Sequence, residues 1–376
     1  MNNNKVKILA YYLPQFHEIK ENNEWWGKGF TEWENVKKAV PLFEGHLQPR
    51  VPLDDNYYDL SNVDVMRWQA ETANKNGLYG FCFYHYWFSD KPLLEKPLEN
   101  YLKAVDIKFP FCFCWANESW TNGWAKPECS IIMEQKYGVK RDWKKHFDYL
   151  LPFFKDNRYI KENSAPLIVI YRPYLYDNMI EMLEYWKQLA VYNGFSGLKF
   201  ASQRFEEPEK FPEIYDYLDY HIYYEPIKTN QNKRNGKKDF RSRIHDFILN
   251  KFNIDISIRQ AITGPVKFDY DEIWNNILKR EYNTKTIAGA FVNWDNTPRH
   301  SRRGSVFVNV SPDKFGLYMK KQIKNVWENY NNKYLFLFAW NEWGEGGILE
   351  PDKENKYEYL YALRSAVEYF DSEDNL

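Results

Sequence analysis

Two glutamates flanked by tryptophans follow directly after a short apolar run near the end of the chain. Residues 335–339 are all apolar, which predicts a buried strand, and residues 340–347 read Trp-Asn-Glu-Trp-Gly-Glu-Gly-Gly. If that turn is helical, Glu342 and Glu345 project to one side. Glycosidic-bond chemistry needs such a pair, because one carboxyl donates a proton while the other accepts one or attacks, and flat indoles stack on sugar rings. The alternative is that both glutamates cap a helix or pair with arginines.

Elements that could position this pair are visible along the whole chain. Helical patterns separate several of the apolar runs, at 63–76, 180–192 and 318–330. Most of the runs are continuous, which is typical of parallel strands covered on both faces. They are Val6–Leu13, Leu78–Tyr84, Phe109–Trp115, Pro166–Tyr171, Leu198–Ser202, Leu218–Tyr224, Ile287–Trp294 and Leu335–Trp340. The pattern predicts an α/β fold, a single-domain (β/α)8 TIM barrel over residues 1–376, with loop insertions on its C-terminal face and a basic insertion at about 226–260.

The carboxyl ends of the strands should carry the site, because barrels of this kind place their sites there. Nearly every predicted strand ends in aromatic residues and hydrogen-bonding groups, which together resemble a rim for binding sugar. The predicted substrate-binding residues are Tyr11, Tyr12, His17, His85, Tyr86, Trp87, Trp115, Asn117, Glu118, Trp120, Arg172, Tyr223, Tyr224, Asn293, Trp294, Asp295, Arg299, Asn341 and Trp343. Taken singly these are weak signals: His85 could be a structural histidine, and Asn117 and Asn341 could cap helices.

Two loops expected on the same face are rich in cations. After the sixth run come Lys228, Lys233, Arg234, Lys237, Lys238, Arg241 and Arg243, and after the seventh come Arg299, His300, Arg302 and Arg303. Such charge runs are usually solvated loops. The functional alternative is a basic lip, meaning these two groups of cations together, that binds phosphate or an acidic polysaccharide.

Composition excludes several other classes of function. A net charge of −1 gives no global field toward nucleic acid or membrane. The aromatic content of 19% exceeds what a core needs, which favours a stacking ligand. Cys82, Cys112 and Cys114 lie inside apolar runs and are expected to be buried thiols, and no metal site or cofactor is predicted. The N-terminus lacks the apolar region of a signal peptide, and no stretch reaches membrane-spanning length, so a cytoplasmic location is expected.

Several motifs in combination resemble one family over about residues 7–350. They are Tyr-Tyr-Leu-Pro-Gln-Phe-His at 11–17, Gly-Phe-Thr-Glu-Trp at 29–33, Phe-Tyr-His-Tyr-Trp-Phe at 83–88, Phe-Cys-Trp-Ala-Asn-Glu at 113–118, Asn-Thr-Pro-Arg at 296–299 and Trp-Asn-Glu-Trp-Gly-Glu-Gly at 340–346. The chain is similar to the WbsX-type group of O-antigen and capsule gene clusters. That group is called glycosyltransferases but resembles glycoside hydrolase family 99, whose members are retaining, metal-independent endo-α-mannosidases and endo-α-mannanases on (β/α)8 barrels.

The resemblance implies roles for the two glutamates. Glu342 would be the base that deprotonates the 2-hydroxyl of the substrate, which then closes on the anomeric carbon. Glu345 would protonate the leaving oxygen and then activate water. Two carboxylates on one short turn also leave little room for the water of an inverting enzyme, whose carboxyls are roughly 6.5–9.5 Å apart. Family 99 usually has His where this chain has Gly344, and that departure concerns the leaving-group side.

Three functions remain open from the sequence. The first is a retaining glycosidase-type enzyme acting on an α-mannose-like linkage of a surface polysaccharide. The second is a glycosyltransferase or transglycosylase with a phosphate-activated donor, although no glycine-rich nucleotide site or Asp-x-Asp motif is present. The third is a non-catalytic glycan-binding barrel. The expected partner is an oligosaccharide or polysaccharide, with an anionic or lipid-diphosphate-linked form as one possibility.

Overall fold

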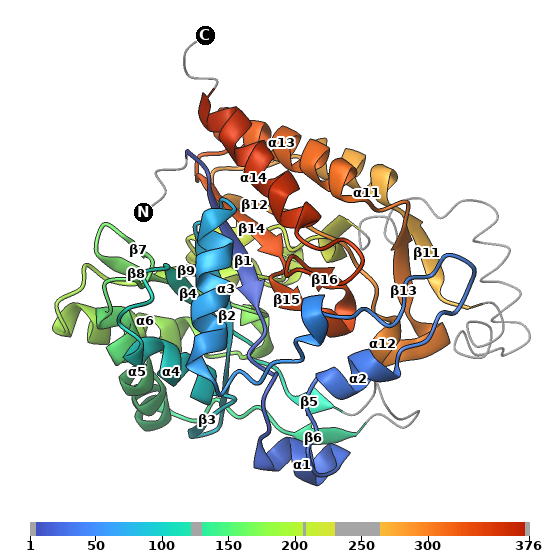
Figure 1. The fold of residues 1–376 in the computed structure, drawn as a ribbon. Coiled ribbons are helices and arrows are strands. Elements are labelled where there is room, and N and C mark those ends of the chain that lie inside the picture. The colour runs from blue at the N-terminus through green and yellow to red at the C-terminus, as the bar shows by residue number, and fades with distance from the viewer. Residues whose placement is uncertain (1–4, 122–129, 206–207, 230–263, 373–376) are drawn as a thin grey trace, which may run out of the picture.

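A closed ring of eight parallel strands forms the centre of the computed structural model, which describes residues 5–121, 130–205, 208–229 and 264–372 (Figure 1). Neighbouring strands pair in chain order, and the pairing of β1 with both β2 and β14 closes the ring. The strands are β1 (Lys7–Tyr12), β2 (Gly80–Phe88), β4 (Phe111–Trp115), β8 (Ala165–Ile170), β9 (Lys199–Ser202), β10 (Tyr220–Ile222), β12 (Thr286–Phe291) and β14 (Tyr334–Phe338). The predicted (β/α)8 barrel is therefore confirmed.

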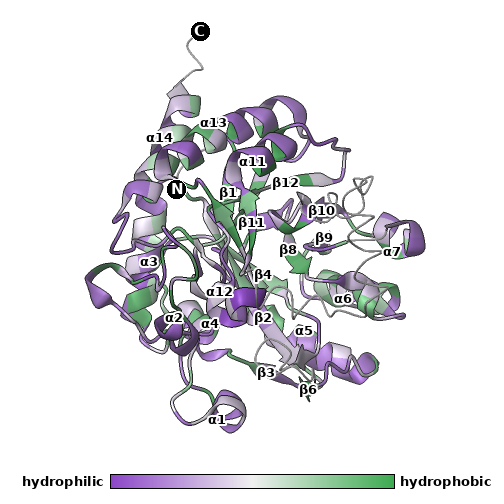
Figure 2. Cartoon of the chain, turned by 90° about the vertical axis from the view of Figure 1, so that its right-hand side faces the viewer, coloured by the Kyte–Doolittle hydropathy of each residue, from purple (hydrophilic) through white to green (hydrophobic). Residues whose placement is uncertain are grey.

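Helices follow the strands and cover the outside of the ring. They are α3 (Val63–Lys75), α4 (Lys96–Lys103), α5 (Lys140–Lys155), α6 (Met179–Tyr192), α7 (Pro212–Tyr217), α11 (Tyr270–Leu278), α13 (Pro312–Asn329) and α14 (Glu358–Ser372). Figure 2 shows hydrophobic strands inside and helices with hydrophilic outer surfaces, as a parallel sheet covered on both faces requires. The helix starts are encoded locally: Ser311 accepts from the amide of Lys314, and Asp269 accepts from the amide of Glu272.

Short helices and strands lie in the loops that connect the barrel strands with the outer helices. The short helices are α1 (Lys20–Trp26), α2 (Trp33–Lys38), α12 (Thr297–His300) and the 3-10 turns η1 (Leu53–Asp55), η2 (Pro173–Leu175), η3 (Pro208–Lys210), η4 (Ser301–Arg303) and η5 (Trp343–Glu345). The short strands are β3 (Lys91–Leu93), β5 (Trp120–Thr121), β6 (Ile131–Met133), β7 (Lys161–Glu162), β11 (Val266–Asp269), β13 (Ser305–Val308), β15 (Asn341–Glu342) and β16 (Gly347–Ile348). Of these, α2 and α12 lie side by side (Figure 1).

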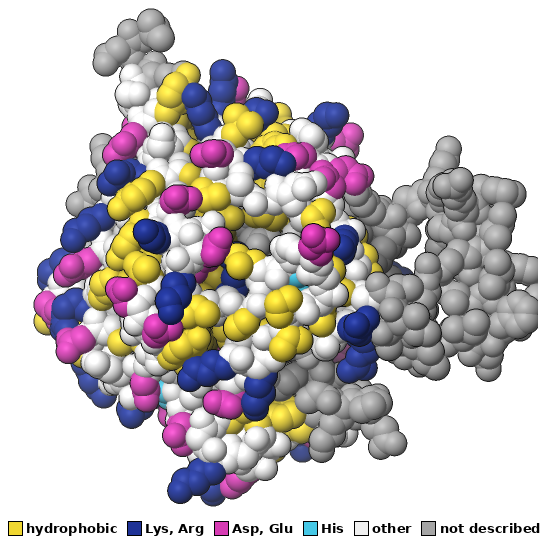
Figure 3. Space-filling model, turned by 45° about the vertical axis from the view of Figure 1, so that its right-hand side comes forward, with side chains coloured by type: hydrophobic (Ala, Val, Ile, Leu, Met, Phe, Trp, Pro, Cys, Tyr) yellow, Lys and Arg dark blue, Asp and Glu magenta, His cyan; other side chains and the backbone are white. Residues whose placement is uncertain are grey.

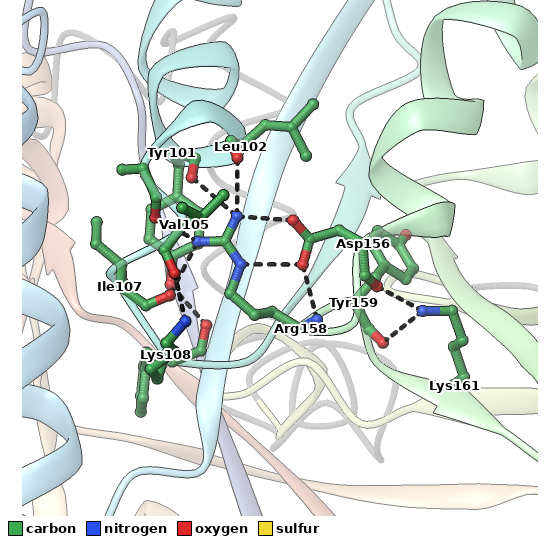
Figure 4. Close-up of polar contacts among 11 residues, drawn as sticks. Tyr101, Leu102, Val105, Ile107, Lys108, Asp156, Arg158, Tyr159 and Lys161 are labelled. Carbon is green, nitrogen blue, oxygen red and sulfur yellow. Dashed lines mark hydrogen bonds and ion pairs between the residues drawn. The ribbon is translucent and has the colours of Figure 1, made fainter.

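An arginine secures the connection before β4. The guanidinium of Arg158 pairs with Asp156 at 2.7 Å and donates to the main-chain carbonyls of Tyr101, Leu102, Ala104 and Ile107 (Figure 4). These carbonyls belong to the end of α4 and the loop after it, where the carbonyls of a helix C-terminus have no intrahelical partner. Arg158 therefore fastens the end of α4, away from the strand ends that carry the site.

The surface carries charges of both signs. On the face drawn in Figure 3, the described Lys and Arg side chains are interspersed with Asp and Glu, in agreement with the net charge of −1. Cys82, Cys112 and Cys114 are buried free thiols, as predicted. Among the described residues, no helix is both long and apolar enough to cross a membrane.

Candidate functional site

A cavity of about 340 Å³ opens at the carboxyl ends of the barrel strands. Both Glu342 and Glu345 lie in its wall, so the structure brings the predicted pair into one cavity. The other lining residues are Leu13, Gln15, Asn22, Trp26, Phe30, Glu32, Tyr84, Tyr86, Ala116, Glu118, Ser119, Trp120, Thr121, Ile132, Tyr171, Tyr224, Arg299 and His300. Aromatic rings and carboxylates thus dominate the lining.

The two glutamates lie on a small hairpin that follows β14. Strand β15 pairs antiparallel with β16, and the 3-10 turn η5 connects them, so the helical turn expected here is a single tight one. Asn341 ties this hairpin to the end of β1, since its Oδ1 accepts from the amide of Leu13 at 2.7 Å and its Nδ2 donates to the Leu13 carbonyl at 3.0 Å. The pair is therefore held on a rigid support.

One guanidinium contacts three carboxylates at the centre of the site. Arg299 donates from Nε to Glu32 Oε1 at 2.7 Å and from Nη1 to Glu345 Oε1 at 2.7 Å. Its Nη2 lies 3.2 and 3.3 Å from the two oxygens of Glu342. Glu32 precedes α2 and Arg299 lies on α12, so the contact between these two helices brings the group together. Both glutamates do pair with an arginine, as the alternative expected, but this arginine lines the same cavity, so the pairing does not exclude a role for them in the site.

Burial changes the protonation of this cluster. It raises the pKa of Glu342 to about 8, with Arg299 opposing the shift and Glu345 and Glu32 adding to it. Burial also raises the pKa of Glu345, again against the opposing charge of Arg299. Three carboxylates share one cation, so the group carries excess negative charge when all of them are ionised. A retained proton on the pair near neutral pH relieves that repulsion.

Gly344 is explained by the same cluster. A Cβ placed on this residue would meet the Glu32 carboxylate and would lie 2.7 Å from Nε of Arg299. Its φ is not in the left-handed region, so backbone conformation does not require glycine here. The space beside the turn is filled by the ion pair of Arg299 and Glu32, so a side chain at position 344 would displace that pair.

Asp295 is hydrogen-bonded to the turn that carries the two glutamates. Its carboxylate accepts from Gln48 Nε2 at 2.7 Å, from the Thr297 hydroxyl at 2.6 Å and from His46 Nε2 at 2.8 Å. Because His46 Nδ1 accepts from a backbone amide, its proton lies on Nε2. The backbone amide of Asp295 donates to the carbonyl of Glu345 at 2.7 Å. Asp295 therefore positions the turn and does not line the cavity, in contrast to the sequence expectation.

Five of the predicted substrate-binding residues do line the cavity. They are Tyr86, Glu118, Trp120, Tyr224 and Arg299. Tyr86 accepts from Gln15 Nε2 at 2.9 Å, and its ring lies edge-on to Trp120 with centroids 5.2 Å apart. Glu118 pairs with Arg172 at 2.8 Å.

Four predicted residues point to the opposite side of their strands. Tyr12, His85, Trp87 and Trp115 alternate with inward-facing neighbours and are directed toward the surrounding helices. Tyr12 donates to Gln69 of α3 at 2.5 Å, and the other three pack on His146 of α5. Because of this alternation the four residues do not line the cavity, in contrast to the prediction. His85 is buried against α5, as the structural alternative expected, and burial lowers its pKa to about 3.

The remaining predicted residues do not line this cavity. Tyr11 packs inside the barrel on Tyr84, His17 contacts a backbone carbonyl, and Tyr223 donates to the carbonyl of Glu281, between α11 and β12. The asparagine Asn117 bonds to the backbone of Arg172 in both directions, as Asn341 does to Leu13, so neither caps a helix. The others that lie behind the lining are Asn293, Trp294 and Trp343.

The basic lip is only partly described. Residues 233–243 lie outside the described residues. Arg299 belongs to the carboxylate cluster and not to a lip, because it is buried among three acidic groups. His300 lines the cavity, and burial lowers its pKa. Arg302 and Arg303 are exposed on η4.

Two acidic residues bonded to the site or its hairpin, Glu32 and Glu350, were not among the predicted site residues, and Gly344 had been noted only as a departure from the family pattern. Glu32 lies within the Gly-Phe-Thr-Glu-Trp motif, which was noticed only as part of the resemblance. Glu350 follows the hairpin and accepts four side-chain hydrogen bonds, and Gly344 gives room to Arg299. Among the described residues, no group of three His, Cys, Asp or Glu side chains could hold a metal ion.

Paired carboxylates in an aromatic-lined cavity at the strand ends of a (β/α)8 barrel are an arrangement that glycosidic-bond chemistry can use. The chain belongs to the family described as glycosyltransferase WbsX, whose profile matches residues 8–363. It is 35% identical over 364 residues to an uncharacterized protein WxcX of Xanthomonas campestris pv. campestris strain B100, and 34% identical to that of strain ATCC 33913. These matches cover 96% of the chain, and the chain spans about half the length of the curated relatives it matches, 49% in each case.

Solved structures share the fold. The family 99 endo-α-mannosidase from Bacteroides thetaiotaomicron aligns with a TM-score of 0.55 at 14% identity, covering 98% of both chains. A glycoside hydrolase-like protein aligns with a TM-score of 0.54 at 12% identity, covering 98% of this chain and 95% of its own. The chain thus belongs to the WbsX family and shares its fold with the family 99 endo-α-mannosidase.

Proposed function

We propose that the protein cleaves or transfers a sugar at an α-mannoside-like linkage of a surface polysaccharide, with retention of anomeric configuration. The observation that carries this proposal is the binding of Glu342 and Glu345 to neighbouring nitrogens of one guanidinium. Carboxylates held so close together suit the roughly 5–5.5 Å separation of retaining enzymes better than the wider spacing of inverting ones. The mannose-like substrate comes from the resemblance to family 99.

In this proposal the two glutamates have separate tasks. Glu342 accepts the proton of the substrate's 2-hydroxyl, whose oxygen bonds to the anomeric carbon as the bond to the leaving oxygen breaks. Glu345 gives its proton to that leaving oxygen and then takes a proton from the water or hydroxyl that opens the intermediate. In this second step Glu342 returns its proton to the 2-oxygen as the bond between that oxygen and the anomeric carbon breaks. Burial raises the pKa of both glutamates, so the pair retains a proton near neutral pH. The reactive form has this proton on Glu345, ready for the leaving oxygen, and an ionised Glu342, whose raised pKa makes it a stronger base.

Aromatic side chains supply the surfaces for the sugar rings. Trp26, Phe30, Tyr86 and Trp120 line the cavity together with the carboxylates. Trp120 is only partly buried, and its indole lies edge-on to Tyr86, Phe88 and Trp25. Flat rings beside acidic groups favour a neutral sugar at the reacting centre, since its apolar face stacks and its hydroxyls bond.

The test is a pair of isosteric substitutions. Glu342→Gln and Glu345→Gln should each lower turnover of an α-mannan, measured by release of reducing ends, by about 100-fold or more. Glu34→Gln on α2, whose side chain is half exposed and pairs with Lys38, is the matched control and should keep wild-type activity. Near-wild-type turnover in Glu342→Gln would contradict the assignment and make Glu118 the next candidate base.

A transfer reaction is the second candidate, and the description of the family as glycosyltransferases favours it. The same pair of glutamates would serve, because a sugar hydroxyl can replace water in the second step. Mass spectrometry of products formed from α-mannooligosaccharides distinguishes the two. Shortened chains alone indicate hydrolysis, chains longer than the substrate indicate transfer, and tight binding without any product would indicate a glycan-binding barrel.

We further infer that the polysaccharide carries negative charge near the reacting sugar. Arg302 and Arg303 are exposed directly after His300, which lines the cavity. An anion there would be a uronate or phosphate of the chain or the diphosphate of a lipid-linked glycan. Activity on a charged glycan should fall as salt rises and fall with Arg302→Ala and Arg303→Ala, while activity on its neutral counterpart stays constant. A flat salt response for both glycans would contradict this inference.

A further inference from the structure

A third buried glutamate lies directly behind the hairpin that carries the catalytic pair. The Oε1 atom of Glu350 accepts from Gln69 Nε2 at 2.6 Å and from Trp340 Nε1 at 2.9 Å. Its Oε2 accepts from the Tyr58 hydroxyl and from Trp343 Nε1, both at 2.8 Å. Glu350 is 4% exposed, and each carboxylate oxygen has two donors.

Two of these four donors flank one of the proposed catalytic residues in the sequence. Trp340 and Trp343 stand immediately before and after the segment Asn341–Glu342, so both indoles that flank Glu342 end on the same carboxylate. The main chain adds to this, because the amide of Glu350 donates to the carbonyl of Trp340 at 3.1 Å. Burial raises the pKa of Glu350 to about 7, while its four hydrogen bonds oppose the shift.

None of these contacts reaches the cavity that holds the catalytic pair. Trp340, Trp343 and Glu350 are absent from its lining, and the two tryptophans are fully buried. Glu350 therefore cannot exchange a proton with a substrate there. Its effect on the reaction must pass through the hairpin.

We propose that Glu350 is a positioning residue: by fixing the indoles on both sides of Glu342, it sets the orientation of that carboxylate in the cavity. The kinetic part of this inference rests on the proposed function, and the spectroscopic part does not. A shift of the reacting groups by about 1 Å can cost 100-fold in rate, so a loosened turn should lower turnover without lowering substrate affinity.

A glutamine at position 350 could not accept hydrogen bonds from all four donors. Its amide oxygen can keep one pair of donors, and its NH2 group must then face the other pair. The Tyr58 hydroxyl can rotate to accept, but an indole N–H is only a donor. Since each carboxylate oxygen bonds one indole, either orientation of the amide leaves Trp340 or Trp343 facing an N–H group.

The experiment compares Glu350→Gln with Glu354→Gln, an exposed glutamate four residues further on. In wild-type protein labelled with 15N-tryptophan, the Trp340 and Trp343 indole signals are assigned from Trp→Phe variants. Glu350→Gln should move at least one of them upfield and should change the titration of the Glu342 13Cδ signal, assigned from Glu342→Gln. Glu354→Gln should change neither signal.

Kinetics complete the test. With an α-mannan, Glu350→Gln should lower kcat by about 10- to 100-fold and leave KM within about twofold. The double variant Glu350→Gln with Trp343→Phe should lose less than the product of the two single losses, because the phenyl ring removes a conflicting donor.

Each outcome decides the inference. Unchanged indole and Glu342 signals in Glu350→Gln would overturn it, as would shifted signals with wild-type kcat. A wild-type protein without turnover of any α-mannoside would reject the proposed function, and the NMR signals would still decide whether Glu350 orients Glu342. Independent losses of kcat in the double variant would also overturn it, because Glu350 would then act without the Trp343 indole.

Discussion

The Nη1 atom of Arg299 donates to Oε1 of Glu345 over 2.7 Å, across the cavity wall between α12 and the hairpin after β14. This contact joins a residue of the seventh strand's loop to one of the eighth, and Arg299 also reaches Glu32 and Glu342. Arg299 is therefore the cation that bonds all three carboxylates. Its removal should be visible in the pH dependence of activity.

Arg299→Met should move the pH profile of kcat/KM to higher pH. Arg299 lowers the pKa of both Glu342 and Glu345, so without it both pKa values rise and both limbs of a bell-shaped profile shift upward. Breaking this buried group should also cost about 3–5 kcal/mol of stability, so the assay temperature must stay below the melting point of the variant. Arg141→Met, on the surface of α5, is the exposed control, and an Arg299→Met profile that overlays wild type would contradict the account.

Glu342→Gln should stabilise the protein at alkaline pH. The folded pKa of about 8 lies above the ordinary value of 4.5, so between these two pH values the folded state holds a proton that the unfolded state releases. Below about pH 4.5 this proton does not lower the free energy of unfolding. Between about pH 4.5 and pH 8 the free energy of unfolding falls by at most about 1.4 kcal/mol per pH unit, and above about pH 8 it falls no further. Thermal melts should give similar Tm values near pH 5 and a higher Tm for the variant near pH 9. A constant difference would be evidence against the raised pKa.

Gly344→Ala should disturb the site by steric contact alone. The new Cβ would meet the Glu32 carboxylate and Nε of Arg299, so the ion pair must shift. We expect about 1–3 kcal/mol of destabilisation and at least a tenfold loss of kcat, measured by denaturation and by reducing-end release. Adding Glu32→Asp shortens the obstructing side chain and should restore part of both quantities. No rescue would mean that the contact with Glu32 is not the cause.

Activity should not depend on a divalent cation. The proposed chemistry uses only carboxylates, and among the described residues no cluster of ligands suits a metal. Dialysis against EDTA should leave kcat unchanged. Activity that disappears with EDTA and returns with a divalent cation would refute this.

The barrel and the carboxylate pair could be predicted because both are encoded locally. Each apolar run matches a strand, and Glu342 and Glu345 lie on one short turn. The strand-end residues were less reliable because all of them were assigned to the site without regard to the two faces of a strand. Alternation along β2 turns Tyr86 inward and His85 outward, and a period of two would have separated them.

The long-range partners could not be predicted from the sequence. Glu32 is 267 residues from Arg299, and Gln69 is 281 residues from Glu350. No local pattern indicates which buried charge meets which, since only the closed barrel brings these loops together. Arg299 was assigned both to the substrate-binding residues and to a solvated or anion-binding loop, and its pairing with three carboxylates was not predicted.

The stereochemistry of the first product tests the central claim most directly. The reaction of wild-type protein with an α-mannan, followed by 1H NMR before mutarotation, should show the α-anomer first, because two carboxylates bound to one guanidinium act through a double displacement. A first-formed β-anomer would contradict the account. It would remove Glu342 and Glu345 as a retaining pair and direct attention to Glu118, which lines the same cavity from the loop after β4.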